Sequence, residues 1–188
     1  MKKSPGIRVI VGGPPNSGKS TLSESLAMAL RSYGIDAYAQ DLDLASETLP
    51  YIRGEKAWEL RSKEKKPWTM ELAEEAAKLF VDASQKYKVV IGDAPGKITP
   101  ESRRIIQEAT CGIVLCREDC IREMESWKRC FESLGVPTIV MAVSKMTGSG
   151  NVSLNEIINA TIVGLDRKPK VDETIESLTW HIKERLNL

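Results

Sequence analysis

The segment 13–21, which reads GPPNSGKST, restricts the fold of this chain more than any other part of its sequence. It matches the pattern G-x-x-x-x-G-K-S/T at every fixed position, and that pattern is typical of a loop whose backbone N–H groups surround phosphate oxygens. The β-branched run at 7–11 predicts a buried strand before the loop, and the amphipathic stretch at 19–32 predicts a helix after it. A phosphate group is therefore expected at the N-terminus of this helix.

The residue types within this phosphate-binding loop (P-loop, residues 13–21) fit triphosphate and metal chemistry. Lys19 supplies a positive charge for the β- and γ-phosphates, and the Ser20 hydroxyl is a ligand for Mg²⁺. Glycine allows the backbone to approach the phosphates closely. We expect a nucleoside triphosphate and Mg²⁺ to bind at Gly13, Asn16, Ser17, Gly18, Lys19, Ser20 and Thr21.

A second motif, VVIGDAPG at 89–96, is an apolar strand that ends in an aspartate. Asp93 is predicted to hold Mg²⁺ directly or through water, and Gly96 to bring its N–H to the γ-phosphate. One predicted strand separates the two motifs, which is typical of the kinase and GTPase branch of P-loop proteins. No glutamate follows Asp93, as it does in many ATPases. The alternative for Asp93 is an ordinary turn after a strand.

A third feature is the pair Asp41 and Asp43, at the end of the strand predicted at 37–42. Ligands of parallel sheets lie beyond the carboxyl ends of the strands, so a carboxylate here is expected to face the γ-phosphate. Alternation along a strand places both carboxylates on one face. Asp43, with Asp41 as the fallback, is predicted to orient a nucleophile or accept its proton, which makes Lys19, Asp43 and Asp41 the candidate catalytic residues. Alternatively, both carboxylates cap a turn.

The segment 53–68 combines basic and acidic residues with Trp58 and Trp68. Basic residues next to aromatic ones suit an anionic acceptor, either a small molecule or single-stranded nucleic acid. Because the charges are mixed, a solvated helix whose tryptophans face the core is the slightly favoured interpretation.

Apolar runs alternate with helical patterns along most of the chain. Strands are expected at 7–11, 37–42, 88–91, 112–116, 137–143 and 161–165, and helices at 19–32, 55–65, 69–84, 100–109, 121–134 and 171–186. This alternation predicts an α/β fold of the P-loop NTPase type, in which helices cover both faces of a parallel sheet. The chain is expected to form a single domain over 1–188, with a plain loop at 148–151.

Composition limits the classes of partner. The net charge of +1 provides no overall attraction to DNA or to a membrane, and no stretch is apolar enough to span a bilayer. The N-terminus has no signal-peptide pattern, so a cytoplasmic location is expected. The four cysteines, at 111, 116, 120 and 130, show no C-x-x-C spacing, and reduced thiols are therefore expected.

The identity of the nucleotide depends on the segment 144–147, which reads SKMT. GTP-specific proteins usually carry Asn-Lys-x-Asp after a late strand, and the aspartate that would accept hydrogen bonds from guanine is missing here. ATP is therefore the expected nucleotide.

The segments GGPPNSGKS at 12–20, GDAPGKITPE at 92–101 and ESW at 125–127 together resemble the P-loop ATPase domain that accompanies CRISPR ring nucleases. In that family the domain is often fused to a small domain that degrades cyclic oligoadenylates. Because the ATPase fold accounts for the whole sequence, the resemblance implies an accessory or regulatory ATPase with a ring nuclease as its partner.

A weaker resemblance is to polynucleotide 5′-hydroxyl kinases, which share G-P-x-x-S-G-K-S-T and D-L-D, although Pro-Gly-Gln follows D-L-D in those kinases and LAS at 44–46 follows it here. Three functions stay open at this point. They are an ATP-hydrolysing switch, a kinase that transfers the γ-phosphoryl group to a hydroxyl, and a nucleotide-binding module with little turnover.

Overall fold

A single mixed sheet forms the centre of the molecule in the computed structural model, which describes residues 5–57 and 66–188. Its strands are β1 (Ile7–Gly12), β2 (Ala37–Asp41), β3 (Val89–Asp93), β4 (Cys111–Arg117), β5 (Thr138–Lys145), β6 (Asn151–Ser153) and β7 (Ile158–Val163). The order across the sheet is β2-β3-β1-β4-β5-β7-β6, and within the described residues all neighbouring pairs are parallel except β6 with β7. The predicted parallel sheet is confirmed, but its middle strand is β4, with β1 and β5 beside it, rather than the predicted centre at β1 and β3.

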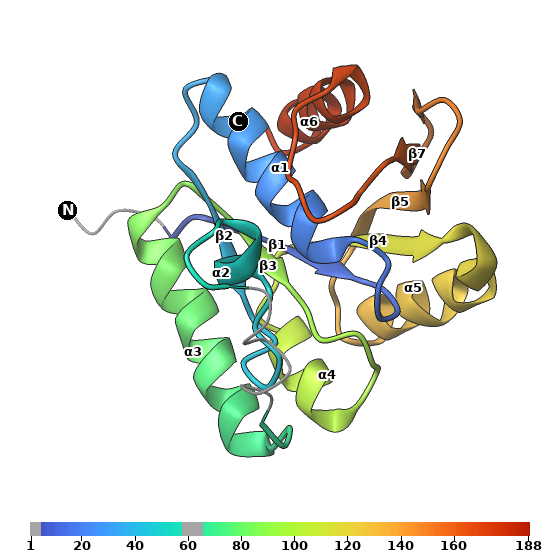
Figure 1. Cartoon of the computed structure of the whole chain (residues 1–188). Helices are drawn as coiled ribbons and strands as arrows, with labels where there is room; N and C mark the ends of the chain where they lie inside the picture. The colour runs from blue at the N-terminus through green and yellow to red at the C-terminus, as the bar shows by residue number, and fades with distance from the viewer. Residues whose placement is uncertain (1–4, 58–65) are drawn as a thin grey trace.

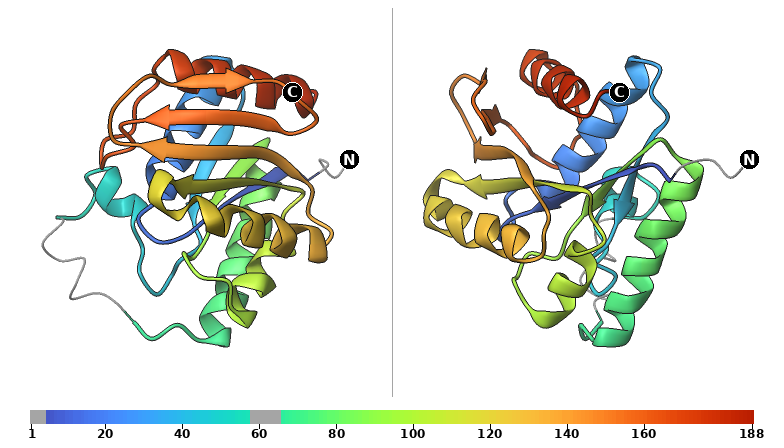
Figure 2. Two further views of the ribbon diagram at one scale, coloured as in Figure 1. Left: turned by 90° about the vertical axis from the view of Figure 1, so that its right-hand side faces the viewer. Right: turned by 180° about the vertical axis from the view of Figure 1, so that it is seen from behind.

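Helices cover both faces of this sheet (Figure 1). They are α1 (Lys19–Ser32), α2 (Leu49–Ile52), α3 (Met70–Lys86), α4 (Pro100–Ile106), the 3₁₀ helix η2 (Glu118–Glu123), α5 (Met124–Ser133) and α6 (Glu173–Arg185). One apolar core lies between the sheet and α1 with α6, and a second lies between the sheet and α3, α4 and α5. Figure 2 shows the same layers from the side and from behind. The two cores explain why the strands read as nearly continuous apolar runs.

Local signals explain where several helices begin. The Thr69 hydroxyl accepts a hydrogen bond from the Leu72 N–H before α3, and the Asp172 carboxylate accepts one from the Ile175 N–H before α6. Thr99 forms a capping box with the third residue of α4. Each cap satisfies backbone donors that have no partner inside the helix.

Helix α5 packs directly beneath the strand that leads into the P-loop. A Cβ added at Gly12 would lie 2.7 Å from the Phe131 ring and 2.8 Å from the Trp127 ring. A Cβ at Gly112, on the neighbouring strand, would lie 2.3 Å from Phe131. Glycine at these two positions lets the large aromatic side chains approach the sheet backbone, which fixes the base of the loop.

Several predicted boundaries differ from the structure. The helix expected at 55–65 is absent over 55–57, which follow a turn after α2, and its positions 58–65 lie outside the described residues. The helix expected at 121–134 begins as the 3₁₀ helix η2 and becomes α-helical at Met124. The plain loop expected at 148–151 ends in the short strand β6, which adds an antiparallel edge.

The thiol groups of all four cysteines are free of disulfide bonds. Cys111, Cys116 and Cys130 are buried, and Cys120 is half-buried. Burial raises the pKa of Cys111 and of Cys116 to about 12, which keeps both thiols protonated. Over the described residues, no helix has the length and apolar character needed to cross a membrane.

Candidate nucleotide-binding site

A cleft of about 630 Å³ opens at the carboxyl ends of β1, β2 and β3. The P-loop forms one wall, and residues from the segments after β2, β3 and β7 form the rest. The lining consists of Pro15, Asn16, Ser17, Gly18, Lys19, Ser20, Thr21, Asp43, Ser46, Thr48, Ile52, Trp68, Asp93, Ala94, Pro95, Gly96, Lys97, Thr99, Leu165, Asp166 and Arg167. This edge of a parallel sheet is where ligands of such folds bind.

Two glycines of the P-loop have conformations and surroundings that exclude a side chain. Gly13 has a φ of 151°, and a Cβ there would lie 1.8 Å from the Leu115 carbonyl oxygen. Gly18, at the start of α1, has a φ of 92°, and its Cβ would lie 2.7 Å from Cβ of Leu165. Gly18 lines the cleft, whereas Gly13 lies at the base of the loop, outside the lining. The other P-loop residues predicted to bind the nucleotide, which are Asn16, Ser17, Lys19, Ser20 and Thr21, all line the cleft.

The side chain of Lys19 contacts the backbone of the P-loop to which it belongs. Its Nζ donates a hydrogen bond of 2.9 Å to the Pro14 carbonyl oxygen, and the residue is 8% exposed. Burial lowers the pKa of Lys19, while the Asp93 and Asp43 carboxylates act in the opposite direction. The ammonium group therefore stands between the P-loop backbone and the acidic side of the cleft.

Ser20 and Asp93 meet at the mouth of the P-loop. The Ser20 hydroxyl donates to Oδ2 of Asp93 over 2.5 Å, and Asp93 is buried at the end of β3. The pairing follows from the sheet, because Asp93 lies beside Val11 in the register of β1 and β3. A hydroxyl and a carboxylate are oxygen donors of the kind that Mg²⁺ takes in nucleotide sites, so the two residues fit this ion.

Gly96 lies against the P-loop. A Cβ at this position would be 2.9 Å from the Pro15 backbone nitrogen. The loop that carries Gly96 is attached to β1, because the Ala94 N–H donates to the Val11 carbonyl oxygen over 3.1 Å. The backbone after β3 thus passes directly along the phosphate end of the cleft.

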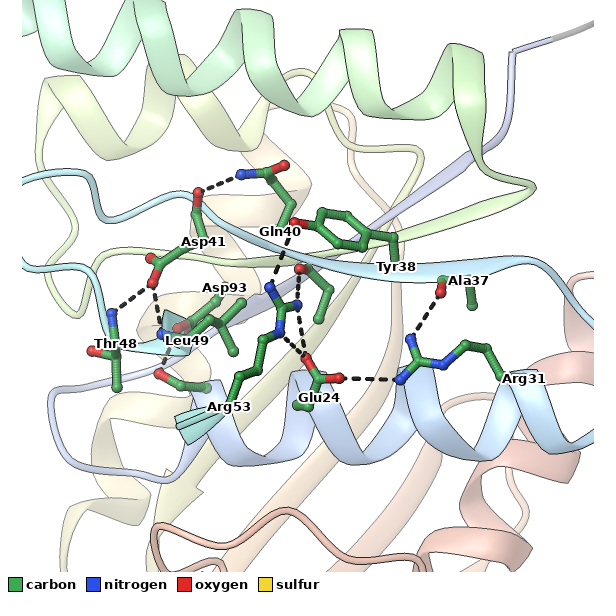
Figure 3. A network of polar contacts seen from close by, with 12 residues as sticks. Glu24, Arg31, Ala37, Tyr38, Gln40, Asp41, Thr48, Leu49, Arg53 and Asp93 are labelled. Carbon is green, nitrogen blue, oxygen red and sulfur yellow. Dashed lines mark hydrogen bonds and ion pairs between the residues drawn. The ribbon is translucent and has the colours of Figure 1, made fainter. Parts of the chain in front are cut away.

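Asp41 and Asp43 occupy different environments, and Figure 3 shows Asp41 beside Thr48 and Leu49. Strand β2 ends at Asp41, so the alternation predicted to continue to residue 43 stops there. Oδ2 of Asp41 accepts hydrogen bonds from the N–H groups of Thr48 (2.6 Å) and Leu49 (2.8 Å), and its Oδ1 accepts one from Asp43 N–H (3.2 Å). Asp41 is buried and outside the lining, whereas Asp43 lines the cleft.

The electrostatic state of Asp41 follows from its position. Burial, and then the neighbouring Asp93 carboxylate, raise its pKa to about 8, although the backbone N–H groups favour the charged form. The three hydrogen bonds from backbone N–H groups match the alternative in which the Asp41 carboxylate caps a turn. The turn it holds is the one that presents Asp43 to the cleft.

An ion-pair network attaches the segment after β2 to α1, and the sequence did not indicate it. Nε of Arg53 donates a hydrogen bond of 2.8 Å to Oε2 of Glu24, and Nη2 of Arg53 lies 2.7 Å from the same oxygen. Nη2 of Arg31 lies 3.1 Å from Oε1 of Glu24. The guanidinium of Arg53 is 5.0 Å from the centre of the Tyr38 ring. Figure 3 shows Glu24 between the two arginines. No local pattern could identify Arg53 as a partner of Glu24, because the two residues are 29 positions apart in the sequence.

The far end of the cleft comes from the loop after β7 rather than from the segment 144–147, which is absent from the lining. Leu165, Asp166 and Arg167 line this end. The Thr21 hydroxyl donates to the Asp166 carbonyl oxygen, and the Lys170 N–H donates to the Ser25 hydroxyl over 3.0 Å. This loop was missed because its proximity to α1 depends on contacts across 145 residues.

Of the segment 53–68, for which a solvated helix was slightly favoured over an acceptor site, only the two ends lie in the described residues. Trp68 packs against the second apolar core and also lines the cleft, and Lys66 N–H donates to the Ala45 carbonyl oxygen over 2.9 Å. The predicted roles of Trp58 and the charged residues up to 65 fall outside the described part of the chain.

Comparisons with known proteins identify the fold. Neither the protein-family models nor the curated proteins contain a match. Among solved structures, the chain is similar to the septum site-determining protein MinD complexed with Mg-ADP from Pyrococcus horikoshii (16% identity, 74% of this chain and 70% of that one, TM-score 0.58).

Two further solved structures give the same result. One is cobyrinic acid a,c-diamide synthase from Mycobacterium smegmatis with an ATP analog and magnesium (15% identity, 74% and 72% covered, TM-score 0.55). The other is the kinase domain of the Escherichia coli tyrosine kinase ETK (18% identity, 73% and 67% covered, TM-score 0.54). The chain therefore has the α/β fold of P-loop nucleotide-binding proteins.

Proposed function

We propose that this chain is a Mg²⁺-dependent ATP-binding protein that hydrolyses ATP in the cleft at the P-loop. The observation that carries the proposal is the 2.5 Å hydrogen bond between the Ser20 hydroxyl and Asp93. It brings the two expected Mg²⁺ ligands together in the cleft that Lys19 also lines. The solved structures that share the fold include proteins with bound Mg-ADP and with an ATP analog and magnesium, which supports the same chemistry.

The residues of the cleft have distinct roles in this proposal. Hydrolysis forms a bond from a water oxygen to the γ-phosphorus and breaks the bond to the oxygen that bridges the β- and γ-phosphates, whose electron pair leaves with ADP. Asp43 orients the water and accepts its proton. Lys19 contacts the β- and γ-phosphates, and Gly96 donates its N–H to the γ-phosphate. Bound at Ser20 and Asp93, Mg²⁺ supplies positive charge that offsets the phosphate charge.

An accessory or regulatory role is consistent with the position of Gly96. The loop at 94–99 lies against Pro15 and along the phosphate end of the cleft. Its contacts therefore depend on whether a γ-phosphate is present, as in nucleotide-controlled switches. The partner that we propose from the sequence resemblance is a ring nuclease of the CRISPR-associated kind.

A kinase is the second candidate, and the extent of the cleft favours it. Beyond the P-loop the lining continues over Asp43, Ser46, Thr48 and Trp68, which leaves a wall for an acceptor. In this case Asp43 would accept the proton of a hydroxyl instead of water, and the γ-phosphoryl group would pass to that oxygen. The acceptor would be a small anionic molecule or a nucleic acid.

Replacing Asp93 by asparagine is expected to weaken ATP binding by about tenfold or more in the presence of Mg²⁺ and only slightly in its absence. The reason is that the variant loses a charged ligand of the metal and keeps the P-loop contacts. Calorimetric titration of ATP with Mg²⁺ and with EDTA measures both cases. Asp36→Asn, an exposed aspartate before β2, serves as the control. Equal weakening in the two conditions would contradict a metal role for Asp93.

ATP is expected to bind more tightly than GTP. The sequence argument for this preference is that the segment 144–147 carries no aspartate for guanine. In the structure that segment lies outside the cleft lining, and Leu165, Asp166 and Arg167 line the far end of the cleft instead. Competition of unlabelled ATP and GTP against a fluorescent ATP analogue measures the preference. A tenfold advantage for GTP would overturn this assignment and would direct attention to Asp166 in the loop after β7.

A further inference from the structure

The loop at 94–99 is fixed by a hydrogen bond at each end and lies against the P-loop in its middle. At its beginning, the Ala94 N–H donates to Val11 over 3.1 Å. In its middle, Gly96 lies against Pro15 of the P-loop. At its end, the Thr99 N–H donates to the Ser102 hydroxyl over 2.9 Å, which begins α4. The side chain at position 97 therefore starts from a backbone whose place beside the P-loop is fixed.

Lys97 lines the cleft and is exposed. Within residues 5–57 and 66–188, its ammonium group has no hydrogen bond or ion pair, unlike Lys19, which is bound to the Pro14 carbonyl oxygen. A flexible lysine that borders a phosphate site without a partner in the protein is suited to contact an anionic ligand.

The position of Lys97 along the cleft indicates which phosphate of the nucleotide its ammonium group would contact. Lys97 follows Gly96, which lies against the P-loop, and it shares this end of the cleft with Asp93. The opposite end is formed by Leu165 to Arg167, where the Thr21 hydroxyl attaches the loop after β7. In a nucleotide held with its Mg²⁺ at Ser20 and Asp93, the terminal phosphate would lie on the side of Lys97 and the base on the side of Leu165.

We propose that Lys97 binds the γ-phosphate of ATP as a second cation and stabilises the charge that develops during phosphoryl transfer. This inference rests on the proposed function. Asp43 and Asp93 already make this end of the cleft acidic, and a triphosphate adds further negative charge. Lys19 is oriented by the P-loop, whereas Lys97 reaches the γ-phosphate from the loop on the other side. Because ADP has no γ-phosphate, Lys97 distinguishes ATP from ADP.

The test compares Lys97→Ala, Lys97→Arg and Lys86→Ala. Lys86 is an exposed lysine at the end of α3, outside the cleft, and controls for the loss of one surface charge. Calorimetry measures the affinities for Mg·ATP and Mg·ADP, and phosphate release measures kcat. In Lys97→Ala we expect about tenfold weaker ATP binding, an ADP affinity within twofold of wild type, and a kcat lowered at least about tenfold. Lys97→Arg, which keeps the charge, is expected to recover part of both losses.

The outcomes separate this inference from the proposed function. Wild-type affinities for ATP and ADP in Lys97→Ala, together with a kcat within twofold of wild type, would overturn the role of Lys97 and leave the ATPase proposal intact. Equal weakening of ATP and ADP would also overturn it, because a γ-phosphate contact cannot affect ADP. A wild-type protein that binds no Mg·ATP would overturn both.

Discussion

Replacing Lys19 by alanine is expected to lower the affinity for Mg·ATP by about 10- to 150-fold, and turnover with it, while the fold survives. The range corresponds to the loss of one charge-assisted contact, about 1.5–3 kcal/mol. Lys19 makes its hydrogen bond within its own loop, to Pro14, so the substitution removes little that holds other elements together.

Calorimetric titration with Mg·ATP measures the loss for Lys19→Ala, and thermal unfolding checks that the variant is folded. Lys86→Ala, which removes a lysine outside the cleft, is expected to bind like wild type. Wild-type affinity and turnover in folded Lys19→Ala would contradict the assignment of the P-loop.

The largest effect on rate is expected for Asp43→Asn. Turnover should fall by about 10²- to 10⁴-fold, because the group that orients the nucleophile and accepts its proton is lost. ATP affinity should change little, since Asp43 lies after β2 rather than in the P-loop. Steady-state phosphate release and calorimetry on the same protein separate the two quantities.

Asp41→Asn is the informative comparison for Asp43. Asp41 accepts hydrogen bonds from three backbone N–H groups and lies outside the cleft lining, so its replacement acts through the turn at 43–49 and is expected to lower thermal stability.

A change in turnover of no more than a few-fold in Asp43→Asn, with every acceptor tried, would remove the base from the mechanism. Hydrolysis without a protein base would then be the stronger account.

The P-loop and the sheet could be predicted because their signals are local. The segment 13–21 is a contiguous motif, and buried parallel strands read directly as apolar runs, so β1, β3 and α1 lie where the sequence indicates. The neighbouring positions of Ser20 and Asp93 follow once β1 and β3 are placed side by side, since register then brings the strand ends together. These are the parts of the site that one strand and one loop determine.

The other walls depend on tertiary contacts that no local pattern encodes. Asp41 and Asp43 were predicted to share a face, but β2 ends at Asp41, and backbone N–H groups from residues 48 and 49 determine its orientation. The ion pair between Glu24 and Arg53 joins separate elements. The first three residues of the helix expected at 55–65 follow a turn at Gly54 and are not helical, and the rest of that segment lies outside the described residues.

The central claim is tested most directly by following the label from γ-labelled ATP, with and without Mg²⁺, in the presence of a panel of hydroxyl compounds. Wild-type protein is predicted to release labelled free phosphate in a Mg²⁺-dependent reaction, and Lys19→Ala to release little. Label on an acceptor would replace hydrolysis with the kinase alternative and keep the same cleft. If no label leaves ATP under any condition, and calorimetry detects no Mg²⁺-dependent ATP binding, the account of this cleft is contradicted.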